Sequence, residues 1–291
     1  MNSISWRHHY IPQFYLKGFT SPNGMFKIYD VKRKLFIKNG KDFSPESYFF
    51  EKNGNSWISE SHSDDSSEKS FAKIDSKIAE IFKRINQPDA ENKFNVDDDD
   101  IALLQLFVGV MYWRNPANYN EIERIIDRKK LADIGFEIKS TTNKPIDIDS
   151  IEKRIKKDKN FAKMMKFWFP NISYPEIFNC NTPLHIMPFP EGFPSVCNDN
   201  PILVRDPDTF RVYNDDFIFP INNTKIFIRG KKLKRFTATV KIEIDMLMYK
   251  QAVKYVSCTD EKYLEHLDSL YENHYKSITV LRNRIFNQIL E

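Results

Sequence analysis

Alternating apolar and polar residues divide the first part of this 291-residue chain into recognisable elements. Residues 25–30 and 35–38 alternate with a period of two around a short polar connection, which predicts a β-hairpin. Residues 68–85 place apolar side chains three and four apart, a pattern typical of an amphipathic helix. The segment 101–113 is apolar on most faces and follows four acids at 97–100, which suit the positive end of a helix dipole. We therefore predict a central buried helix there.

The pattern changes in the second half of the chain. Residues 119–135 predict a charged helix and residues 161–169 an apolar one, and between them the polar stretch 137–160 reads as an exposed insertion. Frequent prolines then separate short apolar runs that predict strands, at 195–197, 202–204, 217–221 and 225–229. Helices are predicted over 242–255 and 261–289. The order predicts one α+β domain over residues 1–291, with an N-terminal β-hairpin, central helices, a short C-terminal β-sheet and two closing helices.

Composition argues against some functions and indicates the cellular compartment. With only 8 glycines, the sequence has neither GxGxxG nor GxxxxGK[ST], which argues against nucleotide binding of the Rossmann or P-loop kind. Three isolated cysteines without CxxC spacing argue against disulfides and a cysteine-based zinc site, and they fit a reducing compartment. No apolar run is long enough to cross a bilayer. We expect a cytoplasmic protein without a membrane partner. The net charge of +4 neither requires nor excludes a polyanion.

The opening segment, residues 7–19, carries the first candidate site. His8 and His9 stand side by side shortly before Pro12, which is well placed to begin a helix. Backbone geometry ahead of a proline is extended, and adjacent side chains of an extended segment point to opposite sides. At most one imidazole therefore faces a site directly, as a general base or metal ligand. In the alternative interpretation, one histidine caps or packs against the neighbouring helix.

Two further positions combine charge with predicted burial. Arg114 closes the buried helix, where a cation is favoured by the dipole but needs a carboxylate partner. Asp199 and Asn200 precede Pro201 at the end of a short strand, a natural place for a catalytic or metal-binding carboxylate. Alternatively, Arg114 and Asp199 form a buried ion pair that only holds helix to sheet.

Three segments resemble one family in order and spacing. Residues 7–19, RHHYIPQFYLKGF, resemble the HHYxPxFxLxxF opening of the bacterial domain of unknown function 4238 family. Residues 107–116 resemble its helix ending in R-x-P, and 195–202 resemble its S-D-N-P turn, with Asn198 where the family usually has Ser or Thr. The FPI strand at 219–221 follows. The resemblance implies a site map rather than an activity.

These residues favour a metal-dependent nuclease or phosphodiesterase, of a bacterial defence or toxin type, as the first hypothesis. A histidine would activate water, a Mg²⁺ or Mn²⁺ ion would polarise the phosphodiester, and an arginine would stabilise charge on the phosphate. The basic run after residue 228 would form a phosphate-binding rim for nucleic acid. The candidate catalytic residues are His8, His9, Gln13, Arg114 and Asp199; the candidate substrate-binding residues are Arg7, Asn200, Arg229, Lys231, Lys232, Lys234 and Arg235; the candidate metal ligands are Asp199 and Asn200.

Two other hypotheses stay open. The same polar residues would serve a sensor module that recognises a small anionic ligand or a partner protein without breaking a bond. They would also serve a purely structural role, pinning the opening segment between the helix and the strands. Catalysis by a divalent ion usually needs two or more carboxylates, and the sequence offers only Asp199 with a clear position.

Overall fold

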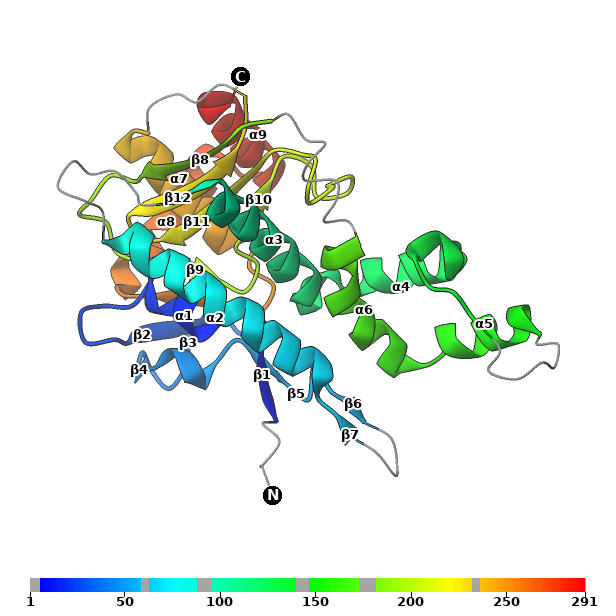
Figure 1. Ribbon diagram of the computed structural model, residues 1–291. Coiled ribbons are helices and arrows are strands. Elements are labelled where there is room, and N and C mark those ends of the chain that lie inside the picture. The colour runs from blue at the N-terminus through cyan, green and yellow to red at the C-terminus, as the bar shows by residue number, and fades with distance from the viewer. Residues whose placement is uncertain are drawn as a thin grey trace.

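The computed structural model describes residues 6–58, 63–87, 96–139, 147–172, 182–231 and 236–290 (Figure 1). The strands in this part of the chain are β1 (Arg7–His9), β2 (Phe26–Asp30), β3 (Leu35–Phe36), β4 (Asp42–Phe43), β5 (Phe50–Lys52), β6 (Trp57–Ile58), β7 (Ser63–Asp64), β8 (Leu184–Pro188), β9 (Val196–Asn198), β10 (Leu203–Val204), β11 (Phe217–Asn222), β12 (Lys225–Arg229) and β13 (Tyr255–Cys258). The α-helices are α1 (Gln13–Lys17), α2 (Ser66–Asn86), α3 (Asp98–Arg114), α4 (Tyr119–Arg128), α5 (Ile148–Lys156), α6 (Lys159–Ile172), α7 (Ala238–Lys250), α8 (Glu261–His274) and α9 (Ile278–Ile289), and short 3-10 turns lie at Pro45–Ser47, Pro116–Asn118 and Ala132–Ile134. The predicted α+β fold is confirmed, with the hairpin at β2 and β3.

An antiparallel sheet in the order β10-β11-β12-β8 separates two hydrophobic cores. Because successive strand side chains point to opposite faces, Phe217 and Phe219 enter the core that holds α3, whereas Ile218, Ile226 and Ile228 enter the core that holds α7 and α9. In Figure 1, α2 and α3 accordingly lie on one side of this sheet, and α7 and α9 lie on the other.

The second large sheet depends on a strand that the sequence pattern did not reveal. β13 pairs with β2 on one side and with β9 on the other, so it joins the N-terminal hairpin to the C-terminal half. The predicted helix over 242–255 was therefore wrong beyond α7, which ends at Lys250. The backbone N–H groups of residues 253–255 donate to the Asp199 carboxylate instead of continuing a helix.

The predicted helix over 261–289 is divided into α8 and α9. Lys276 adopts a positive φ of 55°, which ends the first helix. Ser277 then caps the second helix, because its side chain accepts a hydrogen bond from the N–H of Val280.

Helix α1 anchors the opening segment to the four-stranded sheet. Its first residue follows Pro12, whose extended backbone forms the N-cap. The ring of Tyr15 stacks on Phe219 with centroids 5.2 Å apart, and its hydroxyl donates to the carbonyl of Pro220 at 2.7 Å. The opening segment and the FPI strand, some two hundred residues apart, are thus in direct contact.

The central helix α3 is buried as predicted and begins with a capping box between Asp97 and Asp100. Beyond it, α4, α5 and α6 form an arm that extends to one side of the molecule (Figure 1). In the predicted insertion, α5 has no buried residue, and residues 140–146 lie outside the described residues. No helix within the described ranges has the length and hydropathy required to cross a membrane.

Candidate functional site

A two-stranded ribbon formed by β1 and β5 places the paired histidines on opposite faces. In its antiparallel register His8 lies opposite Glu51 and His9 lies opposite Phe50. His8 is 1% exposed and points inward, whereas His9 is only partly buried on the other face. The prediction that extended geometry separates the two imidazoles is confirmed, and each one has a different environment.

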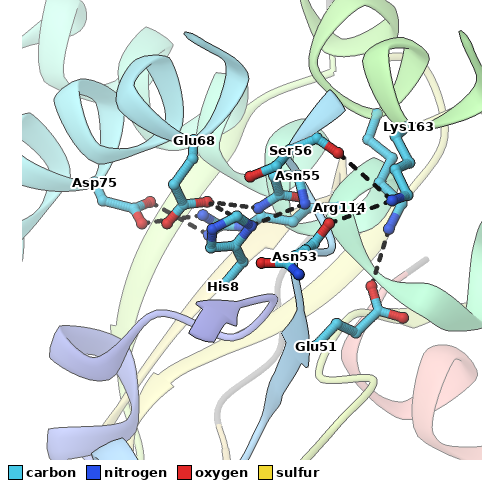
Figure 2. Close-up of polar contacts among 10 residues, drawn as sticks. His8, Glu51, Asn53, Asn55, Ser56, Glu68, Asp75, Arg114 and Lys163 are labelled. Carbon is cyan, nitrogen blue, oxygen red and sulfur yellow. Dashed lines mark hydrogen bonds and ion pairs between the residues drawn. The ribbon is translucent and has the colours of Figure 1, made fainter. Parts of the chain in front are cut away.

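On the inner face, His8 is tied to a loop and to α2 (Figure 2). Its Nδ1 accepts a hydrogen bond of 3.0 Å from the backbone N–H of Asn55. The side-chain amide of Asn55 donates to Glu68 at 2.7 Å, and the Glu68 carboxylate lies 3.9 Å from the His8 ring. Because Nδ1 already accepts a hydrogen bond, the proton of a neutral His8 ring resides on Nε2. His8 is therefore held as a structural acceptor rather than presented as a base.

Arg114 is held beside this histidine by α2. Its guanidinium donates to both carboxylate oxygens of Asp75, at 3.0 and 3.3 Å, and lies 5.1 Å from the centre of the Phe71 ring. Arg114 therefore has the carboxylate partner that burial requires, but the partner is Asp75 and not Asp199. The alternative interpretation, a buried ion pair between Arg114 and Asp199, is wrong.

Helix α6 contributes a second buried cation, Lys166, which is 2% exposed. Its ammonium group donates to Glu51 at 3.0 Å and lies 5.0 Å from the centre of the Tyr119 ring. Burial lowers the pKa of Lys166, and the carboxylate of Glu51 partly opposes that change. Together with the His8 and Arg114 contacts, this pair completes what we call the polar cluster: Lys166 and the residues His8, Glu51, Asn55, Glu68, Asp75 and Arg114, which are labelled in Figure 2.

The Asp199 turn is a junction of backbone hydrogen bonds. The carboxylate of Asp199 accepts from the N–H groups of Val253, Lys254 and Tyr255 at 2.8, 2.7 and 3.0 Å. The side chain of Asn115 donates to the carbonyl of Asp199 at 2.8 Å and to the side-chain oxygen of Asn200 at 3.4 Å. Both predicted metal ligands are thus engaged by protein donors.

Burial raises the pKa of the Asp199 carboxyl, although its backbone donors work against that change. Elsewhere among the described residues, the side chains of His, Cys, Asp and Glu nowhere gather in a group of three that could hold a metal.

A cavity of about 200 Å³ lies where the three segments singled out in the sequence meet. Tyr10 comes from the opening segment, Asn115 from the end of α3 and Asp199 from the turn after β9. We call this the motif cavity; its other walls are Lys32, Phe50, Glu51, Pro116, Ala117, Val253 and Lys254. Residues far apart in the sequence therefore converge on one open space.

The comparisons with known proteins identify a family. The model of a family described as Protein of unknown function (DUF4238) matches residues 7–256. The chain belongs to this family. Neither the curated proteins nor the solved structures contain a match to the chain.

The second histidine of the DUF4238 opening segment has an unusual environment. Burial lowers the pKa of His9, and the nearby charges of Arg114 and Arg7 lower it further, against a backbone hydrogen bond with Glu46. Its Nε2 is buried and has no hydrogen-bond partner among the described residues. The lowered pKa favours the neutral imidazole, but the nitrogen that would act as a base is closed off from solvent.

The other predicted site residues that the structure describes do not line the motif cavity. Gln13 is exposed on α1 and does not line the cavity. Arg229 is fully buried, donating to the carbonyl of Val212 at 3.2 Å, so its predicted role on an exposed phosphate-binding rim is wrong. Lys231 is exposed, and Lys232, Lys234 and Arg235 lie outside the described residues. Arg7 is exposed on the outer face of the ribbon.

The structure adds residues that the DUF4238 resemblance and the sequence pattern did not reveal. Glu68 and Asp75 are seven residues apart on α2, and this spacing of two helical turns is a signal in the chain itself that they share one face of the helix. Glu51 and Lys166 carry no comparable signal, because their contact joins residues 115 apart in the chain.

Proposed function

We propose that the motif cavity binds a small phosphate-bearing anion and that the chain acts as a ligand-binding, sensor-type module. The observation that carries this proposal is the state of the two cavity carboxylates. Glu51 is paired with Lys166, and Asp199 accepts three backbone hydrogen bonds. Once Glu51 is paired with Lys166, the two charges of Lys32 and Lys254 exceed the single carboxylate of Asp199, so the cavity favours an anion.

Tyr10 adds a neutral donor to the same cavity. Burial raises the pKa of its hydroxyl, and the nearby carboxylates of Asp199 and Glu51 raise it further, so the phenol keeps its proton at every physiological pH. A protonated phenol in the same cavity as two lysines suits the oxygens of a phosphate. The volume of about 200 Å³ lies below that of sites for drug-sized ligands, which supports a ligand of mononucleotide size or smaller.

Thermal unfolding with inorganic phosphate and nucleoside 5′-monophosphates tests the proposal. A ligand that binds only the folded chain raises its stability by about 2.7 kcal/mol at one hundred times its Kd. We expect a concentration-dependent rise in Tm that is lost in the double variant Lys32→Gln/Lys254→Gln. Lys262→Gln, which removes an exposed lysine from α8, is the charge-changing control. Equal rises in all three proteins, or no rise with any of these probes, would refute the proposal.

The nuclease hypothesis remains a second candidate because of His9. Burial lowers the pKa of its imidazole, which suits a general base, but this role requires a motion that opens the enclosed Nε2 to a substrate. Arg114, buried and paired with Asp75, would act on a phosphate only through its charge. In this hypothesis a bound Mg²⁺ or Mn²⁺ ion would polarise the phosphodiester. Because Asp199 and Asn200 accept hydrogen bonds from the protein, the hypothesis names no ligand for that metal ion.

Incubation with labelled single- and double-stranded DNA and RNA, with each metal ion and with EDTA, tests the second candidate. We expect cleavage lost in His9→Ala if the hypothesis holds, and His8→Ala, checked for folding, serves as the comparison. Cleavage unchanged in His9→Ala, or no cleavage of any substrate, would reject it and leave the binding module.

A further inference from the structure

The outer face of the β1–β5 ribbon gathers aromatic and cationic side chains at the surface. Because Arg7 lies opposite Lys52 and His9 opposite Phe50, all four side chains share one face of the ribbon. Trp6 precedes them and is 46% exposed. We call these residues the outer face: Trp6, Arg7, His9, Phe50 and Lys52.

The cations of the outer face lie over its rings. The guanidinium carbon of Arg7 is 4.7 Å from the centre of the Trp6 ring and 5.2 Å from that of Phe50. The ammonium of Lys52 is 5.3 Å from the centre of the same Trp6 ring. An exposed indole with a cation on each of two neighbouring strands supplies both a flat surface for a base and positive charge for its phosphates.

Two cations of the outer face lie opposite each other on the ribbon. Like charges directly opposite each other on an antiparallel ribbon repel and destabilise the pair. Arg7 and Lys52 are such a pair, and both are exposed. A phosphate placed between them would contact both cations. Glu46 contributes negative charge at His9, on the same side of the ribbon.

Phe50 connects the outer face to the motif cavity. Its ring lies 6.0 Å from that of Trp6 and 5.6 Å from that of His9, and the same residue forms a wall of the cavity. An extended ligand could therefore occupy the cavity and continue over the ribbon without a break.

We propose that the outer face binds single-stranded nucleic acid, with one base stacked on Trp6 and the adjoining phosphates on Arg7 and Lys52. The neighbouring nucleotide then lies in the motif cavity, and this second part rests on the proposed function. A single strand is required because a duplex keeps the faces of its bases covered. Stacking accepts every base, so binding shows little preference for sequence and strong sensitivity to salt.

Fluorescence anisotropy with short labelled oligothymidine and oligouridine tests the proposal on the full chain. Removing a stacked aromatic costs about tenfold or more in affinity, so we expect that loss in Trp6→Ala and much less in Trp6→Phe. Arg7→Gln and Lys52→Gln should each lower the slope of log affinity against log salt by about 0.7. Lys262→Gln, with the same change in net charge, should leave Trp6-dependent binding intact, and each variant is first checked for an unchanged Tm.

The outcomes separate this proposal from the preceding one. Loss of oligonucleotide binding in Trp6→Ala with normal binding in Lys32→Gln/Lys254→Gln supports the outer face and removes the cavity from the binding path. Phosphate binding in the cavity with equal oligonucleotide affinity of wild type and Trp6→Ala overturns the outer-face proposal and leaves the cavity proposal standing. No oligonucleotide binding at low salt, or equal affinity for a blunt duplex, also overturns it.

Discussion

Two buried groups of charges in this chain are built in different ways. In α7, Lys241 donates to both oxygens of Asp245 at 2.5 and 2.6 Å, one helical turn apart, and Tyr263 of α8 donates to the same carboxylate at 2.7 Å. In the polar cluster, by contrast, the ion pairs join distant segments. Arg114 meets Asp75 across 39 residues and Lys166 meets Glu51 across 115.

The two groups differ in which elements they join and in how far their carboxylates are exposed to solvent. Lys241 and Asp245 are 2% and 4% exposed, so both charges are fully enclosed. In the polar cluster the cations are buried, but Asp75 and Glu51 are 22% and 39% exposed. The α7 pair reinforces a helix and its neighbour, whereas the polar cluster fixes the ribbon, α2, α3 and α6 relative to one another beside the motif cavity. Removal of a cation therefore leaves a buried carboxylate without a partner in the α7 pair, and a partly hydrated carboxylate without a partner in the polar cluster.

Lys241→Met should have the largest effect on stability, about 3–5 kcal/mol, because it leaves Asp245 buried without its cation. Burial already raises the pKa of Asp245, and Lys241 and Tyr263 oppose that rise. When the pKa of an acid is higher in the folded chain than in the unfolded chain, the protein loses stability as the pH rises from the lower pKa to the higher one. The deficit of the variant should accordingly be smaller at pH 5 than at pH 7, as measured by urea unfolding at both.

The double variant Lys241→Met/Asp245→Leu is the control for that prediction. Because it replaces both charges by apolar groups, it should recover most of the lost stability. A double variant as unstable as the single one would show that packing around α7, and not the stranded carboxylate, accounts for the loss.

Arg114→Met should cost less, about 2 kcal/mol, because Asp75 is left partly hydrated rather than enclosed. Arg114→Lys, which keeps the charge but cannot donate in the same bidentate geometry, should fall between the variant and wild type. Urea unfolding of both proteins, compared with Lys241→Met under the same conditions, gives the order. A larger loss for Arg114→Met than for Lys241→Met would contradict the distinction between enclosed and hydrated partners.

The same contrast explains what the sequence could reveal. Local patterns predicted α2, α3, β11 and β12, since spacing along one element is visible in the chain itself. They also indicated that a buried Arg114 needs a carboxylate. The identity of that carboxylate depends on how α2 packs against α3, which no spacing in the sequence shows.

Asp199 shows the same limit from the other direction. A carboxylate at the end of a strand is a reasonable candidate ligand, and the segment does reach the motif cavity. Its oxygens are occupied by the N–H groups that precede and begin β13, a strand whose first residue the pattern assigned to a helix. The backbone that the pattern assigned to a helix thus supplies hydrogen bonds to a residue 54 positions away, which no local pattern shows.

The smallest expected effect is on the pH dependence of stability, and it concerns His9, which belongs to neither group of buried charges. The pKa of His9 lies below its ordinary value of 6.5, chiefly because of burial and then because of Arg114 and Arg7, with Glu46 acting in the opposite direction. As the pH falls below about 6.5, the unfolded chain therefore binds this proton before the folded chain does. The contribution of neutral His9 to stability is fully present above that pH and is lost progressively below it. Replacing the ring with the neutral side chain in His9→Gln should make the decline of Tm between pH 7 and pH 5 shallower.

At pH 8, where the ring is neutral in both states, the difference between variant and wild type measures packing alone and serves as the internal control. Parallel pH profiles would show that His9 titrates alike in the folded and unfolded chain, and the case for a neutral base on the outer face would then lose its physical ground.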